Sequence, residues 1–185
     1  YKWQTYTPYF QGWAKMKLEE HAKNFHKQDI KACVYNCPEI LTNSSSIFQG
    51  VEVSLYPLVG ALSKEKSTYN DKVLNQCKDL IKDEHSFDEV MSFTANYFRH
   101  DLTTTHSLFD RWPQHNSKDQ MEYMLDSSDH LISMHKDPKN LMTFPLSEEV
   151  FKSTGSLMFH DCWSCERPVV WLGHDVIAKQ MATHG

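Results

Sequence analysis

The sequence contains eleven histidines, whose side chains could bind a metal ion. Metal sites on helices need ligands three or four residues apart on one face, as in HExxH or ExxH, and neither motif occurs in the sequence. His85 with Glu89 and His106 with Asp110 have helical spacing, but such pairs are usually surface pairs worth roughly 0.2–0.5 kcal/mol. We therefore predict two structural pairs, and a metal site assembled from distant helices stays open as an alternative.

Five cysteines form the second group that could carry chemistry. Cys162 and Cys165 form a CxxC motif, which in a redox centre should open a helix whose dipole lowers the pKa of the first thiol. Pro168 and a strand-like run follow instead, which disfavours the redox interpretation. A zinc site would need two more ligands, for which the sequence offers Cys33, Cys37 and His160. We favour reduced, packed cysteines over both alternatives.

The segment after residue 166 is the best candidate for a binding site. Its residues favour a strand, and a short sheet with a free edge can accept an extended peptide as an added strand. Tryptophan adds a large aromatic surface of the kind enriched at interfaces, and Arg167 could pair with a carboxylate. The predicted peptide-binding residues are Arg167, Val169, Val170, Trp171 and Leu172. No catalytic residue and no metal ligand is assigned.

A largely helical body must position this segment. Two capping boxes, Ser86 with Glu89 and Ser117 with Gln120, predict helix starts. Residues 51–62 are apolar but contain Pro57, which predicts a kinked helix or two short pieces. Apolar stripes at helical spacing predict the other helices and turns, over residues 13–27, 30–35, 73–81, 87–98, 104–112 and 121–135.

The pattern changes after Pro138. Ser147 is expected to cap a brief helix that Gly155 ends, and a last helix is expected over 175–183. Residues 156–160 and 167–173 have the composition of short strands. The predicted fold is therefore mainly α, α+β, with a helical domain over 1–137 and a small α+β C-terminal subdomain over 138–185 that contains an antiparallel sheet.

Composition and motifs disfavour several classes of function. The net charge is −5 and the lysines are spread out, whereas nucleic-acid binders cluster their basic residues. No run approaches the roughly 20 apolar residues that cross a bilayer. Few cysteines, in an odd number, indicate a reduced, cytoplasmic protein. GxSxG, P-loop and GxGxxG motifs are missing, so serine hydrolysis and nucleotide binding have no support.

The order of several segments resembles a known family. A YPLVGAL segment at 56–62 is followed by a long helical stretch at 87–114, the helix MEYMLDSSDHLISM, and a tail that ends RPVVWLG. This order is similar to that of the helical DUF2063/HvfC-type partner proteins, in which an aromatic-proline segment, a helix pair and a late strand recur. Within that group the length and tail look most like the methanobactin biosynthesis family MbnC.

The resemblance implies a partner subunit of a multinuclear non-haem iron oxygenase. The partner would be an MbnB-like TIM-barrel enzyme in a heterodimer, with iron in that subunit and no cofactor in this chain. The pair would bind the leader of a precursor peptide and convert its cysteines to oxazolone and thioamide in the synthesis of methanobactin, a copper chelator. This chain would be non-catalytic alone but required for the complex. The alternative is a stand-alone, histidine-rich helical protein that binds a metal or haem.

Overall fold

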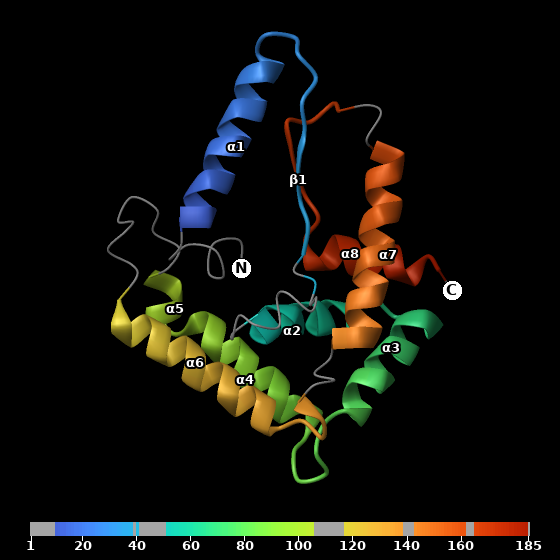
Figure 1. Ribbon diagram of the computed structural model, residues 1–185. Helices are drawn as coiled ribbons and strands as arrows, with labels where there is room; N and C mark the ends of the chain where they lie inside the picture. The colour runs from blue at the N-terminus through green and yellow to red at the C-terminus, as the bar shows by residue number, and fades with distance from the viewer. Residues whose placement is uncertain are drawn as a thin grey trace.

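The computed structural model describes residues 10–38, 40, 51–105, 117–138, 143–161 and 165–184 of the chain. Within these residues the protein is mainly helical, as predicted, with eight helices and two short strands (Figure 1). In chain order the elements are α1 (Phe10–His26), β1 (Val34–Asn36), α2 (Val51–Leu62), α3 (Thr68–Asp79), α4 (Phe87–Arg99), α5 (Asp101–Thr105), α6 (Lys118–Ser133), α7 (Thr143–Asp161), β2 (Val169–Trp171) and α8 (His174–Ala182).

Helix α2 lies at the centre of the core because most of its surface is apolar. It packs against α3, α4, α6 and α8, and its large side chains are almost fully buried: Leu55, Tyr56, Leu58, Val59 and Leu62. Pro57 lies inside this single helix, where its ring nitrogen has no proton to donate to the Val53 carbonyl. Packing on four sides therefore maintains one helix where the sequence allowed two short pieces.

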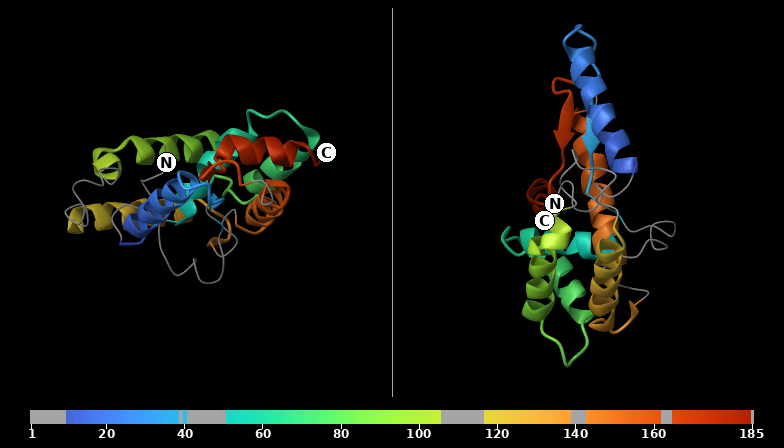
Figure 2. Two further views of the ribbon diagram at one scale, coloured as in Figure 1. Left: turned by 90° about the horizontal axis from the view of Figure 1, so that it is seen from above. Right: turned by 90° about the vertical axis from the view of Figure 1, so that its left-hand side faces the viewer.

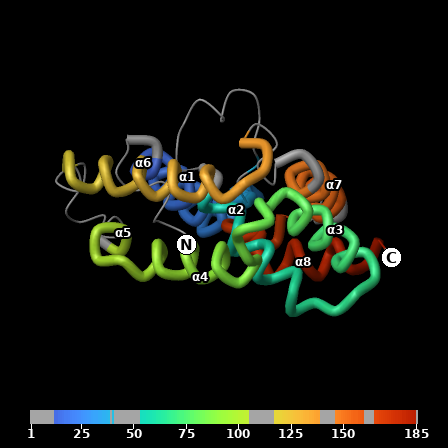
Figure 3. Tube along the Cα trace, turned by 90° about the horizontal axis from the view of Figure 1, so that it is seen from below, coloured from blue at the N-terminus to red at the C-terminus, as the bar shows by residue number. Residues whose placement is uncertain are grey.

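Both predicted capping boxes form. The Glu89 N–H donates to Ser86 Oγ at 3.1 Å, and the Gln120 N–H donates to Ser117 Oγ at 3.2 Å. In each box the side chain at the third helical position accepts in return from the backbone of the cap residue. These caps fix the starts of α4 and α6, which run alongside each other (Figure 3).

Helix α7 corrects one prediction for the C-terminal region. It runs unbroken through Gly155, so the expected helix end and the strand over 156–160 are wrong. Gly155 is exposed, and a glycine inside a helix costs only about 1 kcal/mol relative to alanine. Packing of α7 against α3 and α8, which buries Leu146 and Val150, outweighs that cost.

The small sheet corrects a second prediction. Strands β1 and β2 lie side by side and pair in parallel (Figure 2). Val34 lies opposite Val169, and Asn36 lies opposite Trp171. The sheet is therefore not antiparallel, and its second strand comes from the 30–35 region, where a helical turn was predicted. Strand pairing satisfies the backbone here, since the Val34 N–H donates to the Pro168 carbonyl at 3.0 Å.

The remaining predictions for the chain organisation have mixed outcomes. Helix α5 covers the first part of the helix predicted over 104–112, and residues 106–116 lie outside the described part. Helices α7 and α8 pack on α3, and α8 also packs on α2, while the division into subdomains at residue 137 stays a prediction. Among the described helices, none combines the length and apolar character needed to cross a membrane.

Candidate functional site

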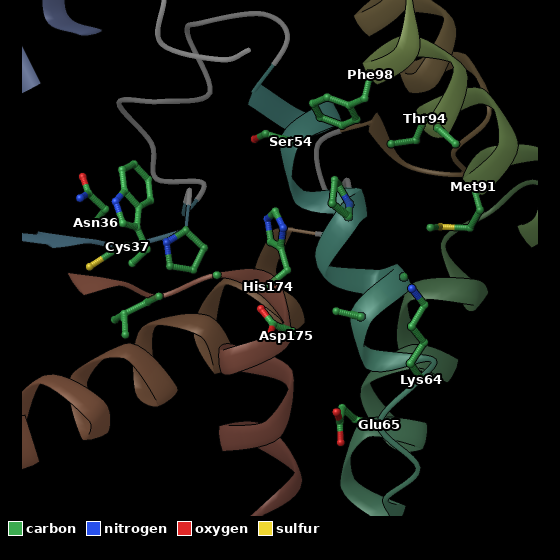
Figure 4. Close-up of a pocket in the computed structure, with 18 residues that line it drawn as sticks. Asn36, Cys37, Ser54, Lys64, Glu65, Met91, Thr94, Phe98, His174 and Asp175 are labelled. Atoms are coloured by element: carbon green, nitrogen blue, oxygen red, sulfur yellow. The ribbon is translucent and has the colours of Figure 1, made fainter. Parts of the chain in front are cut away.

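A cavity of about 650 Å³ lies where α2, α4, the ends of both strands and the start of α8 meet (Figure 4). Its volume falls within the roughly 300–1,000 Å³ of small-molecule sites. The carboxyl ends of two parallel strands open onto it, which is the edge of a parallel sheet where ligands commonly bind. This cavity is the candidate functional site, and we refer to it as the α2–α4 pocket.

Two helical faces form the walls of the α2–α4 pocket. The wall from α4 contains Met91, Thr94, Ala95 and Phe98, and the wall from α2 contains Ser54, Pro57, Gly60 and Ala61, with Lys64 just beyond the end of that helix. Residues three or four apart lie on one side of a helix, so each wall is a single stripe. The Thr94 hydroxyl donates to the Val90 carbonyl at 3.0 Å, which satisfies this polar group within its own helix. The walls are therefore largely apolar.

Gly60 and Met91 face each other where the two walls approach. A Cβ atom added to Gly60 would lie 3.3 Å from the Met91 Cε atom, which is closer than ordinary van der Waals contact. The absence of a side chain at residue 60 therefore leaves room for the Met91 methyl group. Both residues line the pocket where α2 and α4 come into contact.

The strand ends supply the polar part of the lining. Asn36 and Cys37 come from β1 and the residue after it, and Leu172, Gly173 and His174 follow β2. The Asn36 amide donates to a Glu19 carboxylate oxygen of α1 at 2.9 Å, which holds the end of β1 in place. Burial raises the pKa of the Cys37 thiol, so this side chain is an uncharged thiol at neutral pH.

His174 is the first residue of α8 and lies in the middle of the pocket lining (Figure 4). Burial lowers its pKa to about 4, and the neighbouring Asp175 opposes that shift. The positive end of the helix dipole also disfavours a cation there. At neutral pH the imidazole is therefore uncharged, with one nitrogen able to donate and the other able to accept a hydrogen bond.

Charged groups of both signs also line the pocket. Asp175 occupies the first turn of α8, and its Oδ1 atom lies 3.0 Å from the position of a Cβ added to Gly173. Lys64 and Glu65 extend from the end of α2. A carboxylate already occupies the helix end that would attract an anion. The pocket thus suits an elongated molecule with an apolar body and a neutral polar end.

The structure brings together only part of the predicted binding strand. Trp171 and Leu172 line the α2–α4 pocket, Val169 pairs with Val34, and Val170 is buried in the core. Arg167 is exposed before the strand begins. A ligand-contacting role for these residues stays a prediction.

Sequence reasoning missed the helical walls and His174. The small pair Gly60–Ala61 within an apolar helix, and a histidine directly after Gly173, were the available signals.

The metal alternatives gain no support from the described residues. His85 Nδ1 lies 3.1 Å from Glu89 Oε1 in a half-exposed pair, as predicted. His106, Asp110 and Cys162 lie outside the described part of the chain. Elsewhere in the ranges that the structure covers, no three histidine, cysteine or carboxylate side chains gather closely enough to hold a metal ion.

The fold and the site define a mainly helical domain with a pocket of ligand size. The family Enoyl-acyl carrier protein reductase FabMG matches residues 1–181, and the chain belongs to this family. The apo structure of FabMG, a novel type of enoyl-acyl carrier protein reductase, is 42% identical with a TM-score of 0.86. The NADH-bound structure of FabMG is 40% identical with a TM-score of 0.76.

Both matches cover 97% of this chain but only part of the relatives. The chain spans 41% of the apo FabMG chain and 44% of the NADH-bound one. No curated protein matches the chain.

These findings correct the expected identity and function. The family match shows that the DUF2063/HvfC and MbnC resemblance is wrong, and with it the roles in methanobactin synthesis and precursor-peptide binding. No MbnB-like partner is indicated, and the expected cofactor arrangement, with iron in a partner and none here, is overturned by a relative that binds NADH. The YPLVGAL letters are mostly buried core residues of α2, so packing alone accounts for that part of the resemblance.

Proposed function

We propose that this chain is part of an NADH-dependent enoyl-acyl carrier protein reductase, an enzyme of fatty-acid synthesis. The observation that carries the proposal is the 42% identity to FabMG over 97% of the chain, at a TM-score of 0.86. The described fold is thus shared over nearly its full length with a protein of that name. The chain spans less than half of FabMG, so the activity is proposed for the protein to which these residues contribute.

The proposed reaction reduces the carbon–carbon double bond of an enoyl thioester carried on acyl carrier protein. NADH supplies a hydride to the β-carbon, a proton is added to the α-carbon, and the products are a saturated thioester and NAD⁺. The α2–α4 pocket supports the substrate side of this proposal, since it offers apolar walls beside an uncharged imidazole. A dinucleotide fits it less well, because Asp175 lies at the helix end that would otherwise receive a diphosphate.

We also propose that the protein acts in the cytoplasm, where NADH is available. The four cysteines that the structure describes form no disulfide, which agrees with a reducing compartment.

The proposal is tested by mixing the purified protein with NADH and crotonyl-acyl carrier protein. We expect NADH absorbance to fall in proportion to butyryl-acyl carrier protein, identified by mass spectrometry. Butyryl-acyl carrier protein as the starting substrate serves as the control and should consume no NADH. A protein of the length of the solved relatives that folds, binds NADH and leaves the enoyl thioester unchanged would overturn the proposal.

A further inference from the structure

We propose that the α2–α4 pocket binds the acyl chain of the thioester substrate, with the thioester end beside His174 and the hydrocarbon chain between α2 and α4. This assignment rests on the proposed function, and it adds a substrate orientation and a determinant of chain length.

The first argument is the chemistry of the walls. A saturated hydrocarbon chain is stabilised in proportion to the apolar surface removed from water. The α2 and α4 stripes meet this need with Pro57, Ala61, Met91, Ala95 and Phe98. The hydroxyl of Thr94 is bonded within its own helix, so it does not require a partner from the ligand. The walls therefore favour an alkyl chain over a polar metabolite.

The second argument is the polar end of the pocket. A thioester carbonyl is an uncharged acceptor, and a neutral imidazole can donate to it. Figure 4 shows His174 projecting between α2 and the strand ends, with Asp175 beside it. The Asp175 carboxylate would repel a phosphate or a carboxylate at this position. A neutral carbonyl meets no such repulsion, which sets the orientation of the chain.

The third argument concerns chain length. The Met91 methyl group lies 3.3 Å from the position of a Cβ added to Gly60, so these two residues bound the pocket between the helices. An alanine at 60 requires the Met91 methyl group to shift by a few tenths of an ångström, whereas an alanine at 91 removes that group. We infer that Met91, placed by Gly60, limits the length of the acyl chain that fits.

The test measures binding of enoyl N-acetylcysteamine thioesters to the intact protein in the absence of NADH, followed by tryptophan fluorescence. The probes are the crotonyl, hexenoyl, octenoyl and dodecenoyl thioesters. The affinity of the unmodified chain should rise by up to about fourfold per added methylene, as expected for burial of a CH₂ group, and then level off. Met91→Ala should move the levelling point to longer chains and improve binding of the longest probe by about tenfold.

Matched variants exclude a general loss of structure. Met121→Ala removes a partly buried methionine of α6 that does not line the pocket, and it should leave the length profile unchanged. Gly60→Ala should shift the profile to shorter chains, and the Gly60→Ala/Met91→Ala double variant should reverse that shift. Circular dichroism confirms that each variant is folded.

The outcomes separate this inference from the proposed function. No saturable binding to the folded protein, or a length profile that Met91→Ala and Met121→Ala leave equally unchanged, would overturn the pocket assignment even if the same protein consumes NADH. Conversely, length-dependent binding that Met91 controls would support the assignment even if the intact protein leaves the enoyl bond unreduced, and only the proposed function would then fail.

Discussion

The Tyr56 hydroxyl of α2 donates a hydrogen bond to Nε2 of His135, the second residue after α6, and both side chains are buried. His135 Nδ1 donates to the Leu131 carbonyl at 2.8 Å. This bond places the proton on Nδ1 and leaves Nε2 as an acceptor, so the tautomer of a neutral His135 is determined. The pair joins the central helix to the end of α6.

Removing the Tyr56 hydroxyl should destabilise the fold. Tyr56→Phe leaves the buried Nε2 of His135 without its donor, which should lower the free energy of unfolding by about 1–3 kcal/mol. Urea denaturation followed by circular dichroism measures the change. In a His135→Leu background the same substitution should have a much smaller effect. Equal losses in both backgrounds would show that the hydrogen bond does not contribute.

Acid should destabilise the protein through two histidines. Burial lowers the pKa of His135, and it lowers the pKa of His174 to about 4, from an ordinary value of 6.5. In the unfolded chain both take up protons as the pH falls through 6.5, whereas the folded chain resists protonation. The unfolded state therefore binds more protons below 6.5, and stability should fall as the pH drops from 6.5 toward 4.

The His174→Gln variant isolates its share of this pH dependence. The melting temperature should fall less between about pH 7 and about pH 5 in the variant than in the unmodified protein. A slope that His174→Gln leaves unchanged would contradict a depressed pKa at this residue.

Asn70 joins α3 to α8 through a buried side chain. Its Nδ2 group donates to the carbonyls of Glu65 and Ala178, each at 3.1 Å. Asn70→Ala leaves both carbonyls without this donor and should cost about 1–3 kcal/mol. Asn70→Asp should cost more, because it places an acceptor, and at neutral pH a charge, against two carbonyls. Chemical denaturation ranks the variants, and an aspartate variant as stable as the alanine variant would refute this account.

The two capping boxes should contribute independently to stability. Ser86→Ala and Ser117→Ala each remove the hydroxyl that caps a helix, at a cost of about 0.5–2 kcal/mol. The double variant should show nearly the sum, since the caps belong to different helices. Ser133→Ala, on the exposed side of α6, should change stability by less than about 0.5 kcal/mol. Thermal unfolding of the four variants tests the comparison.

The helix starts could be predicted from the sequence because their determinants are local. Ser86 and Ser117 lie three residues before their partners, and that spacing is visible in the sequence. The parallel pairing of Val34 with Val169 could not be predicted in the same way. It depends on how the intervening helices bring two distant segments together.

The pocket was missed for the same reason. Met91 belongs to a helix whose apolar stripe was visible, and Pro57 to a segment recognised only as apolar, but the gap between these two elements is a property of their packing. The resemblance to MbnC relied on letters such as those of residues 56–62, most of which are buried and are selected for packing. Neither these letters nor any glycine-rich motif indicated the NADH that a relative binds.

The most direct test of the central claim follows the hydride. The intact protein is supplied with NADH deuterated at the transferred position and with crotonyl-acyl carrier protein, and the product is analysed by mass spectrometry and NMR. We predict butyryl-acyl carrier protein with one deuterium at the β-carbon. Oxidation of NADH without deuterium in the acyl chain, or an unreduced enoyl group beside bound NADH, would contradict a role in enoyl reduction.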